Sequence, residues 1–404
     1  MSRVRTGEIK ALSGLRIIAA LWVVLFHFRP LLAAASPGLS SALAPVLNAG
    51  AQGVDLFFIL SGFVLTWNYL DRMGESWSTR DTLHFLWLRL ARVWPVYLVT
   101  MHLAAAFAVF TLYVGGFPLA PPVIESINAL SWIRQVLLVQ LWFQPFFDGS
   151  SWDGPAWSIS AEWLAYLLFG GLVLIIFRIA SATRARGLIW LAVAAATAPM
   201  LLLLTHGVFY TPWSWLPRIV MQFTAGALAC AAVRKLELSD RGRMAAGVTS
   251  LLLGAVIVGG VYLLDAYPPG DMLDAGGLVD VLFVPMVITL SIGAGTLPAL
   301  LSTRVLVYLG HISFGLYMVH EIVHTAWNWA ILQFEILLTP SWSAKFIVLG
   351  LIGLAGVLAA LLYHLVEEPA RRWMRRMVEP KGPGAARSAD PPHGRLQSVA
   401  TRAG

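Results

Sequence analysis

Two residues that lipid would exclude lie in one apolar segment, residues 11–28. Arg16 and His27 are eleven positions apart, so an α-helix brings them to within ~20° of one face and roughly 16 Å apart along its axis. A charged side chain inside a bilayer is costly and usually faces a bundle interior or a water-filled cavity. The spacing predicts a helix that lines a cavity, with a cation near one end and an imidazole deeper in. The alternative is that Arg16 snorkels to the headgroups and His27 is a hydrogen-bonded interior residue.

Further ionisable residues are expected at the depth of His27. Asp55 falls at the outer end of a second apolar segment, Glu162 about two turns into a fourth, and His320 and Glu321 some fourteen residues up a ninth, roughly 21 Å from its start. A carboxylate beside a histidine fixes the imidazole tautomer and stabilises its protonated form, which creates a general base. The same groups would equally serve as a proton relay in a transporter.

Membrane-spanning helices must position these residues, because the composition is that of an integral membrane protein. Of 404 residues, 58% are hydrophobic and only 12% are charged, about half the charge of a soluble protein. Apolar runs of about 20 residues predict an all-α, polytopic membrane protein with about ten transmembrane helices. The predicted spans are 12–34, 53–70, 93–115, 156–178, 188–205, 215–233, 244–264, 278–298, 307–330 and 343–366.

Basic residues predict the orientation of the chain. Most of the 28 Lys and Arg residues fall on one side of the predicted spans, together with both chain ends. The positive-inside rule places that side, and both termini, in the cytoplasm. The basic charge then signals topology and requires no nucleic-acid partner. A signal peptide is the alternative for the first span, since Ala-Ala-Ala-Ser at 33–36 imitates a cleavage site, but the apolar run is long enough to remain as a span.

The segments between spans differ in character. Residues 35–50 are predicted to form an outer loop and residues 71–92 an amphipathic, basic segment on the cytoplasmic side. The outer segment 116–155 and the start of the next span hold five tryptophans, which are interfacial anchors or an aromatic platform for a sugar. These are Trp132, Trp142, Trp152, Trp157 and Trp163.

We expect two parts, a transmembrane domain over residues 1–378 and a cytoplasmic tail over residues 379–404. The tail is rich in Pro, Gly, Arg and Ser, a composition typical of disorder. The one cysteine, Cys230, excludes an intrachain disulfide and a cysteine-based metal site, and no metal site is predicted.

Six short motifs, in order over residues 11–370, resemble those of the acyltransferase-3 family of bacterial integral-membrane acyltransferases. The first is the Arg-x10-His spacing of Arg16 and His27. The others are GVDLFFILSGF at 53–63, RLAR at 89–92 with a following proline and tyrosine, WSISAE at 157–162, ISFGLYMVH at 312–320 and EEP at 367–369.

The resemblance implies transfer of an acyl group, usually acetyl, from cytoplasmic acyl-CoA. The acceptor would be a hydroxyl of an extracytoplasmic or membrane-associated glycan or glycoside, and the protein would lie in the bacterial inner membrane. Lipid-linked sugars and macrolides remain alternatives, and the sequence leaves the oligomeric state open.

Each candidate residue has an expected role in that reaction. Arg16, Arg89 and Arg92 would neutralise the CoA phosphates at the cytoplasmic mouth. His27, helped by Asp55 and Glu162, would deprotonate the acceptor or briefly carry the acyl group. The residues expected to contact the acceptor are Trp157, His320 and Glu321.

A secondary transporter or flippase with a buried His/Asp/Glu proton relay is the rival interpretation. The RLAR segment argues against it, because a phosphate-bearing donor needs such cations and a proton relay does not.

Overall fold

The computed structural model describes residues 7–114, 126–206, 208, 210–269, 275–334 and 338–378, and within them the chain is helical with no β-strand. Nine helical segments of this part are long and apolar enough to cross a membrane, and the bent pair α8 and α9 makes up to ten. The predicted all-α, polytopic fold is therefore confirmed.

The α-helices are α1 (Lys10–Ala35), α2 (Pro37–Asn48), α3 (Gly53–Met73), α4 (Thr79–Val114), α6 (Ala129–Val136), α7 (Trp157–Ala182), α8 (Ala185–Thr197), α9 (Met200–His206), α10 (Trp215–Arg234), α11 (Asp240–Ala266), α12 (Phe283–Ile292), α13 (Thr296–Leu301), α14 (Arg304–Gln333), α15 (Trp342–Leu362) and α16 (Glu368–Val378). Short 3-10 turns are η1 (Ala49–Gln52), η2 (Gly154–Ala156) and η3 (Ala275–Leu282), and η4 (Tyr363–Glu367) is a π-helical turn.

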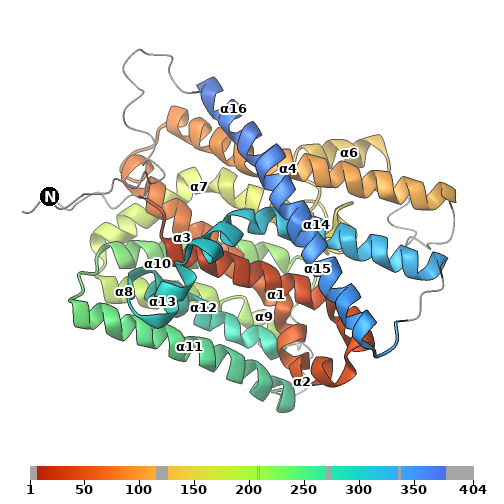
Figure 1. Ribbon diagram of the computed structural model, residues 1–404. Coiled ribbons are helices and arrows are strands. Elements are labelled where there is room, and N and C mark those ends of the chain that lie inside the picture. The colour runs from red at the N-terminus through yellow and green to blue at the C-terminus, as the bar shows by residue number, and fades with distance from the viewer. Residues whose placement is uncertain are drawn as a thin grey trace, which may run out of the picture.

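Most of the long helices run side by side across the view of Figure 1, with α2 at the lower right. Helix α15 continues through η4 into α16, which ends at the upper left. The first described residues and the end of α16 therefore lie toward the same end of the bundle, as an even number of crossings requires. Which side of the membrane that end faces remains a prediction from the basic residues.

Glycines set two close helix contacts on which the site depends. Helix α1 packs against α14, and α3 packs against α10. A methyl group on Gly310 of α14 would lie 1.9 Å from the carbonyl oxygen of Ser13 in α1, and one on Gly62 of α3 would lie 1.9 Å from the carbonyl oxygen of Phe223 in α10. Only glycine permits such approach between helix backbones. The first contact brings His27 to α14, and the second brings Asp55 to α10.

Two predicted loops are helical. Residues 37–48 form α2, and α4 starts at Thr79, so most of the predicted segment 71–92 belongs to a long spanning helix. The hydroxyl of Ser78 accepts a hydrogen bond from the backbone N–H of Asp81, which satisfies a free donor of the first turn. Of the charged residues that ended the predicted apolar run, Arg89 and Arg92 lie in this helix and line a cavity. The predicted tail, residues 379–404, lies outside the described residues, as do residues 115–125.

Candidate active site

A cavity of about 650 Å³ opens near the end of the bundle where the described chain begins. It is lined from α1, α3, α4, α7, α14 and α16, and its volume is that of a typical small-molecule site. We call it the arginine pocket, after its five lining arginines, which are Arg16, Arg89, Arg92, Arg371 and Arg375. Only two carboxylates are among its lining residues, those of Glu8 and Glu162. The pocket therefore suits an anionic ligand with several charges.

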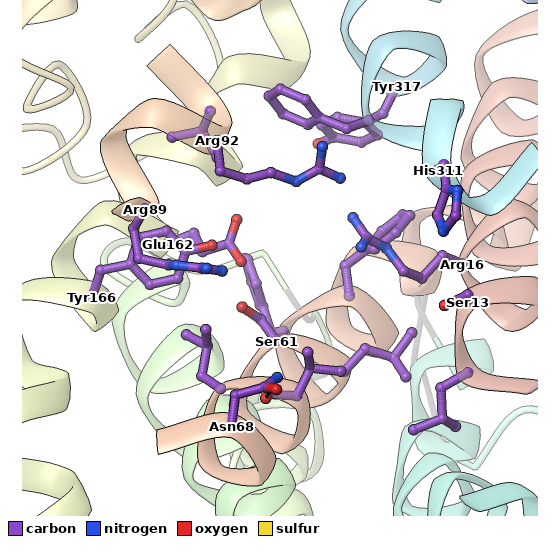
Figure 2. Close-up of a pocket in the computed structure, with 18 of the residues that line it drawn as sticks. Ser13, Arg16, Ser61, Asn68, Arg89, Arg92, Glu162, Tyr166, His311 and Tyr317 are labelled. Atoms are coloured by element: carbon purple, nitrogen blue, oxygen red, sulfur yellow. Dashed lines mark hydrogen bonds between the residues drawn. The ribbon is translucent and has the colours of Figure 1, made fainter. Parts of the chain in front are cut away.

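Three arginines and one carboxylate share the pocket. Figure 2 shows Arg16 and Arg89 on either side of Glu162, which comes from the first turns of α7, and Arg92 extending past it toward Tyr317. Arg89 and Arg92 are three residues apart on α4, so they share one helix face. Among the described residues, none accepts a hydrogen bond from the buried Nε of Arg89. The structure thus unites the three predicted donor-binding arginines, and it places Glu162 among them rather than at His27.

The last helix completes the pocket. Trp87 of α4 donates a hydrogen bond to the carbonyl oxygen of Met374 at 2.8 Å, which ties α16 to α4. Arg371 and Arg375, four residues apart, both line the cavity. Arg92 also forms an ion pair with the buried Glu367, at the π-helical turn before α16. From the sequence, the α16 arginines were expected only to mark the cytoplasmic side of the membrane. Their i, i+4 spacing directly after the EEP motif was the signal that would have found them.

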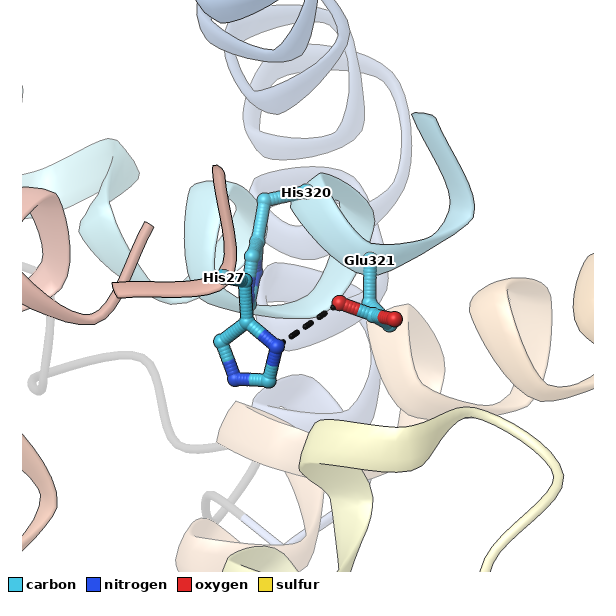
Figure 3. Close-up of side chains that lie close together, drawn as sticks. All are labelled: His27, His320 and Glu321. Atoms are coloured by element: carbon cyan, nitrogen blue, oxygen red, sulfur yellow. Dashed lines mark ion pairs between the residues drawn. The ribbon is translucent and has the colours of Figure 1, made fainter. Parts of the chain in front are cut away.

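Histidines and a carboxylate meet between α1 and α14, farther along the bundle. His27 Nδ1 lies 3.0 Å from Glu321 Oε2, as Figure 3 shows, and the rings of His27 and His320 are 5.0 Å apart at their centroids. His320 is fully buried, and its Nδ1 lies 2.7 Å from the carbonyl oxygen of Tyr317. The side chain of His27 is 32% exposed, so a substrate can reach it. Of the five residues predicted at this depth, the structure brings His27, His320 and Glu321 together.

Tyr317 joins this cluster to the arginine pocket. It lines the pocket, and its ring centroid is 5.9 Å from that of His320. Its hydroxyl donates to the carbonyl oxygen of Pro155 at 3.0 Å and lies 2.8 Å from the hydroxyl of Ser158. Tyr317 therefore contacts both regions, although His27, His320 and Glu321 are not among the residues that line the arginine pocket.

Acidic residues of the segment before α7 also surround the cluster. Asp153 is buried, and burial raises the pKa of its carboxyl group to about 8. Burial also raises the pKa of Asp148, an effect that the nearby His27 opposes. Glu321 is the carboxylate that lies in contact with His27, at 3.0 Å.

Asp55 is not the partner of His27, which corrects the predicted pairing. Its two carboxylate oxygens accept hydrogen bonds from Nε and Nη2 of Arg218, at 3.1 and 2.5 Å. Both side chains are buried, 0% and 1% exposed. The reason is the rotation of α3, whose close contact with α10 turns Asp55 toward Arg218. Depth along a helix, which the sequence supplies, does not specify this direction.

Trp157 belongs to the same buried region. Its ring is 8% exposed, stacks on Phe147 at 4.5 Å, and lies 5.7 Å from the guanidinium carbon of Arg218. It therefore packs around the Asp55–Arg218 pair and is not an open platform for a substrate. Gln52, with its amide oriented to donate, bridges Asp55 and Asp280 at 3.2 and 2.9 Å.

Comparison with known proteins gives a consistent picture. A family model described as "Acyltransferase domain" matches residues 9–364. The chain is similar to acyltransferase MdmB of Streptomyces mycarofaciens, with 27% identity over 92% of this chain and 94% of that protein. It is also similar to the putative peptidoglycan O-acetyltransferase YrhL of Bacillus subtilis, with 24% identity over 90% of this chain and 55% of that protein. No solved structure matches.

Proposed function

The chain belongs to the acyltransferase domain family and is a membrane acyltransferase. We propose that it transfers an acetyl group from acetyl-CoA to a hydroxyl of a glycan or glycoside. The arginine pocket carries the proposal. Five arginines in one cavity match the phosphates of a CoA donor, because guanidinium groups bind phosphate oxygens through charge-assisted hydrogen bonds. A transporter or flippase with a proton relay would have no use for this cluster.

The two ends of the site suit the two substrates. The positive-inside pattern favours a cytoplasmic mouth for the arginine pocket, where acyl-CoA is available. The pantetheine arm would then pass Tyr317 and bring the thioester toward His27, nearer the outer face of a bacterial inner membrane. One relative carries the name of a putative peptidoglycan O-acetyltransferase, which supports acetyl as the group and a carbohydrate as the acceptor.

His27 is proposed as the general base. With its Nδ1 proton facing Glu321, its Nε2 takes the proton from the acceptor hydroxyl. The hydroxyl oxygen attacks the thioester carbonyl, the carbon–sulfur bond breaks, and the proton passes from His27 to the CoA sulfur. An acyl-histidine intermediate on the same atom is the second route. Glu162 orders the arginines around the donor, and His320 packs against the base.

Purified protein in nanodiscs, radiolabelled acetyl-CoA and an acceptor fraction test this function. Mass spectrometry of surface glycans from cells with and without the chain identifies the acceptor fraction. We expect His27→Ala to bind acetyl-CoA normally, because the arginines lie about three turns away. Its transfer rate should fall by about 10²–10⁴, the usual contribution of a positioned general base.

His206→Ala, at an exposed histidine of α9, is the matched control and should transfer normally. Near-normal turnover by His27→Ala would remove His27 from the chemistry. Absence of acetyl-CoA binding by the intact chain would overturn the proposed donor.

A further inference from the structure

A row of polar side chains continues from the His27–Glu321 contact along α14. Glu321, His324, Thr325 and Asn328 follow one another at i, i+3, i+4 and i+7, which places them on one face of the helix. His324 Nδ1 lies 3.3 Å from Glu321 Oε1, and Thr325 donates to the same oxygen at 3.4 Å. Asn328 Nδ2 lies 3.1 Å from His324 Nε2. Glu321 and His324 thus each contact polar groups on both sides, and the row runs from Asn328 to His27.

The chemistry of Asn328 fixes the protons in this row. An amide nitrogen only donates, so Nε2 of His324 must accept, and the ring proton of His324 lies on Nδ1. That proton is donated to Oε1 of Glu321. Oε2 faces His27 Nδ1 at the ion-pair distance of 3.0 Å, with no aligned hydrogen bond between the two atoms. Because an ionised carboxylate only accepts, this contact favours a proton on Nδ1 of His27. Nε2 of His27 is then the free basic nitrogen.

The residues packed around His27, Glu321 and His324 do not compete for the protons of this row. His324 is 14% exposed and packs on the ring of Phe28 at 5.4 Å, which holds its plane. His320 is committed to the carbonyl oxygen of Tyr317. Asp153, whose pKa is about 8, is neutral at pH 7, and Asp148 is the other acid near His27. Among the described residues, Glu321 is therefore the only carboxylate in contact with both His27 and His324.

We propose that His324 and Asn328 are positioning residues, which act through Glu321 to hold His27 as its Nδ1–H tautomer. The inference rests on the proposed function for the role of His27 as the base. A neutral imidazole carries its proton on either nitrogen, and a proton on Nε2 would remove the base. In serine proteases the wrong tautomer costs about 10⁴ in kcat. The outer partners of an oriented histidine contribute less, about 10–100-fold.

Isosteric variants of His324 separate orientation from packing. His324→Leu removes the donor to Glu321, so we expect kcat to fall about tenfold with an unchanged KM for acetyl-CoA. Without that donor Glu321 attracts the His27 proton more strongly, so the acidic limb of the kcat/KM profile should move to higher pH. His324→Asn places an amide N–H near the position of Nδ1. It should restore both kcat and the position of the acidic limb of the kcat/KM profile. Thr249→Val, at an exposed position on α11, is the unrelated control.

A second measurement does not depend on activity. Nitrogen-15 NMR of histidine-labelled protein in bilayers reports which ring nitrogen is protonated, and His27→Ala and His324→Leu assign the two signals. We expect Nδ1–H on both residues in the intact chain, and a mixture on His27 in Asn328→Leu. Nε2–H on His27 in the intact chain would overturn the inference.

The kinetic outcomes separate the inference from the proposed function. If His27→Ala is inactive while His324→Leu keeps the kcat and the pH profile of the intact chain, the positioning role is wrong and the function stands. If His27→Ala turns over normally, the proposed role of His27 fails, and so does the inference that rests on it.

Discussion

Asp55 and Glu321 are both carboxylates inside the helical bundle, but their partners differ. Asp55 is fully buried, and both its oxygens accept hydrogen bonds from the guanidinium of Arg218. Glu321 is 24% exposed and contacts two histidines, one with each oxygen. A carboxylate bound by a permanent cation has no capacity left to orient a base. A carboxylate that faces an imidazole keeps that capacity, so we propose a structural role for Asp55 and a role beside the base for Glu321.

The largest effect should come from breaking the Asp55–Arg218 pair. Arg218→Met leaves a buried, uncompensated carboxylate, and removal of one partner of such a pair costs about 3–5 kcal/mol of stability. Thermal unfolding in detergent would measure the loss. Arg218→Met combined with Asp55→Leu should recover most of it, because an apolar pair replaces the two charges. A single variant as stable as the intact chain would show that Asp55 is not held as the structure indicates.

Glu321→Gln should lower the transfer rate and leave the stability nearly unchanged, in contrast to Arg218→Met. The side chain keeps its size but loses its charge, so His27 is no longer held in one orientation and its protonated form is no longer stabilised. We expect the transfer rate to fall about 10–100-fold with a change in stability below about 1 kcal/mol. Turnover with labelled acetyl-CoA and unfolding of the same preparation provide both values. A large loss of stability with normal turnover would show that Glu321, like Asp55, stabilises the fold and has no role in transfer.

Much of the fold follows from the sequence. Apolar runs of the right length predicted the spanning helices, and the Arg-x10-His spacing placed Arg16 in a cavity and His27 deeper along α1. Depth along the helices also predicted that His27, His320 and Glu321 would meet. These predictions succeeded because the rise per residue of a helix is fixed by its backbone.

Rotation of the helices was not available from the sequence. Close packing at Gly62 turns Asp55 toward α10, and Glu162 of α7 lines the arginine pocket instead of lying beside His27. The role of α16 was missed for a different reason. Its arginines are adjacent to a tail rich in basic residues, and only the hydrogen bond from Trp87 reveals that the helix folds back onto α4.

The arginines of α16 extend the comparison from carboxylates to cations. Arg218 is buried against Asp55, whereas Arg371 and Arg375 line a cavity, where Arg371 also forms an ion pair with Glu368. The double variant Arg371→Gln, Arg375→Gln should weaken acetyl-CoA binding roughly tenfold, because a hydrogen bond to a charged group contributes about 1.5 kcal/mol or more. Arg372→Gln with Arg376→Gln, exposed on the same helix, is the matched control. Equal affinity of both double variants would exclude α16 from the donor site.

The smallest effect should come from a third carboxylate, Glu8, which has a histidine partner like Glu321 but lies at the exposed mouth of the pocket. Its Oε1 is 2.7 Å from Nε2 of His311, and both side chains are 41% exposed. This hydrogen bond lowers the pKa of Glu8 from 4.5 to about 2.

A carboxyl group whose pKa is lowered by folding stabilises the protein above its unfolded pKa, and the contribution disappears as the pH falls through the folded value. Solvent screening keeps the contribution below about 1 kcal/mol. We therefore expect Glu8→Gln to be slightly less stable than the intact chain at pH 7, with the difference shrinking between about pH 5 and pH 2. Unfolding midpoints at pH 7, 5 and 3 would measure it. If the stability difference between Glu8→Gln and the intact chain stays constant with pH, Glu8 contributes by packing and not by its charge. The greater exposure of Glu8 would then not explain how it differs from Glu321.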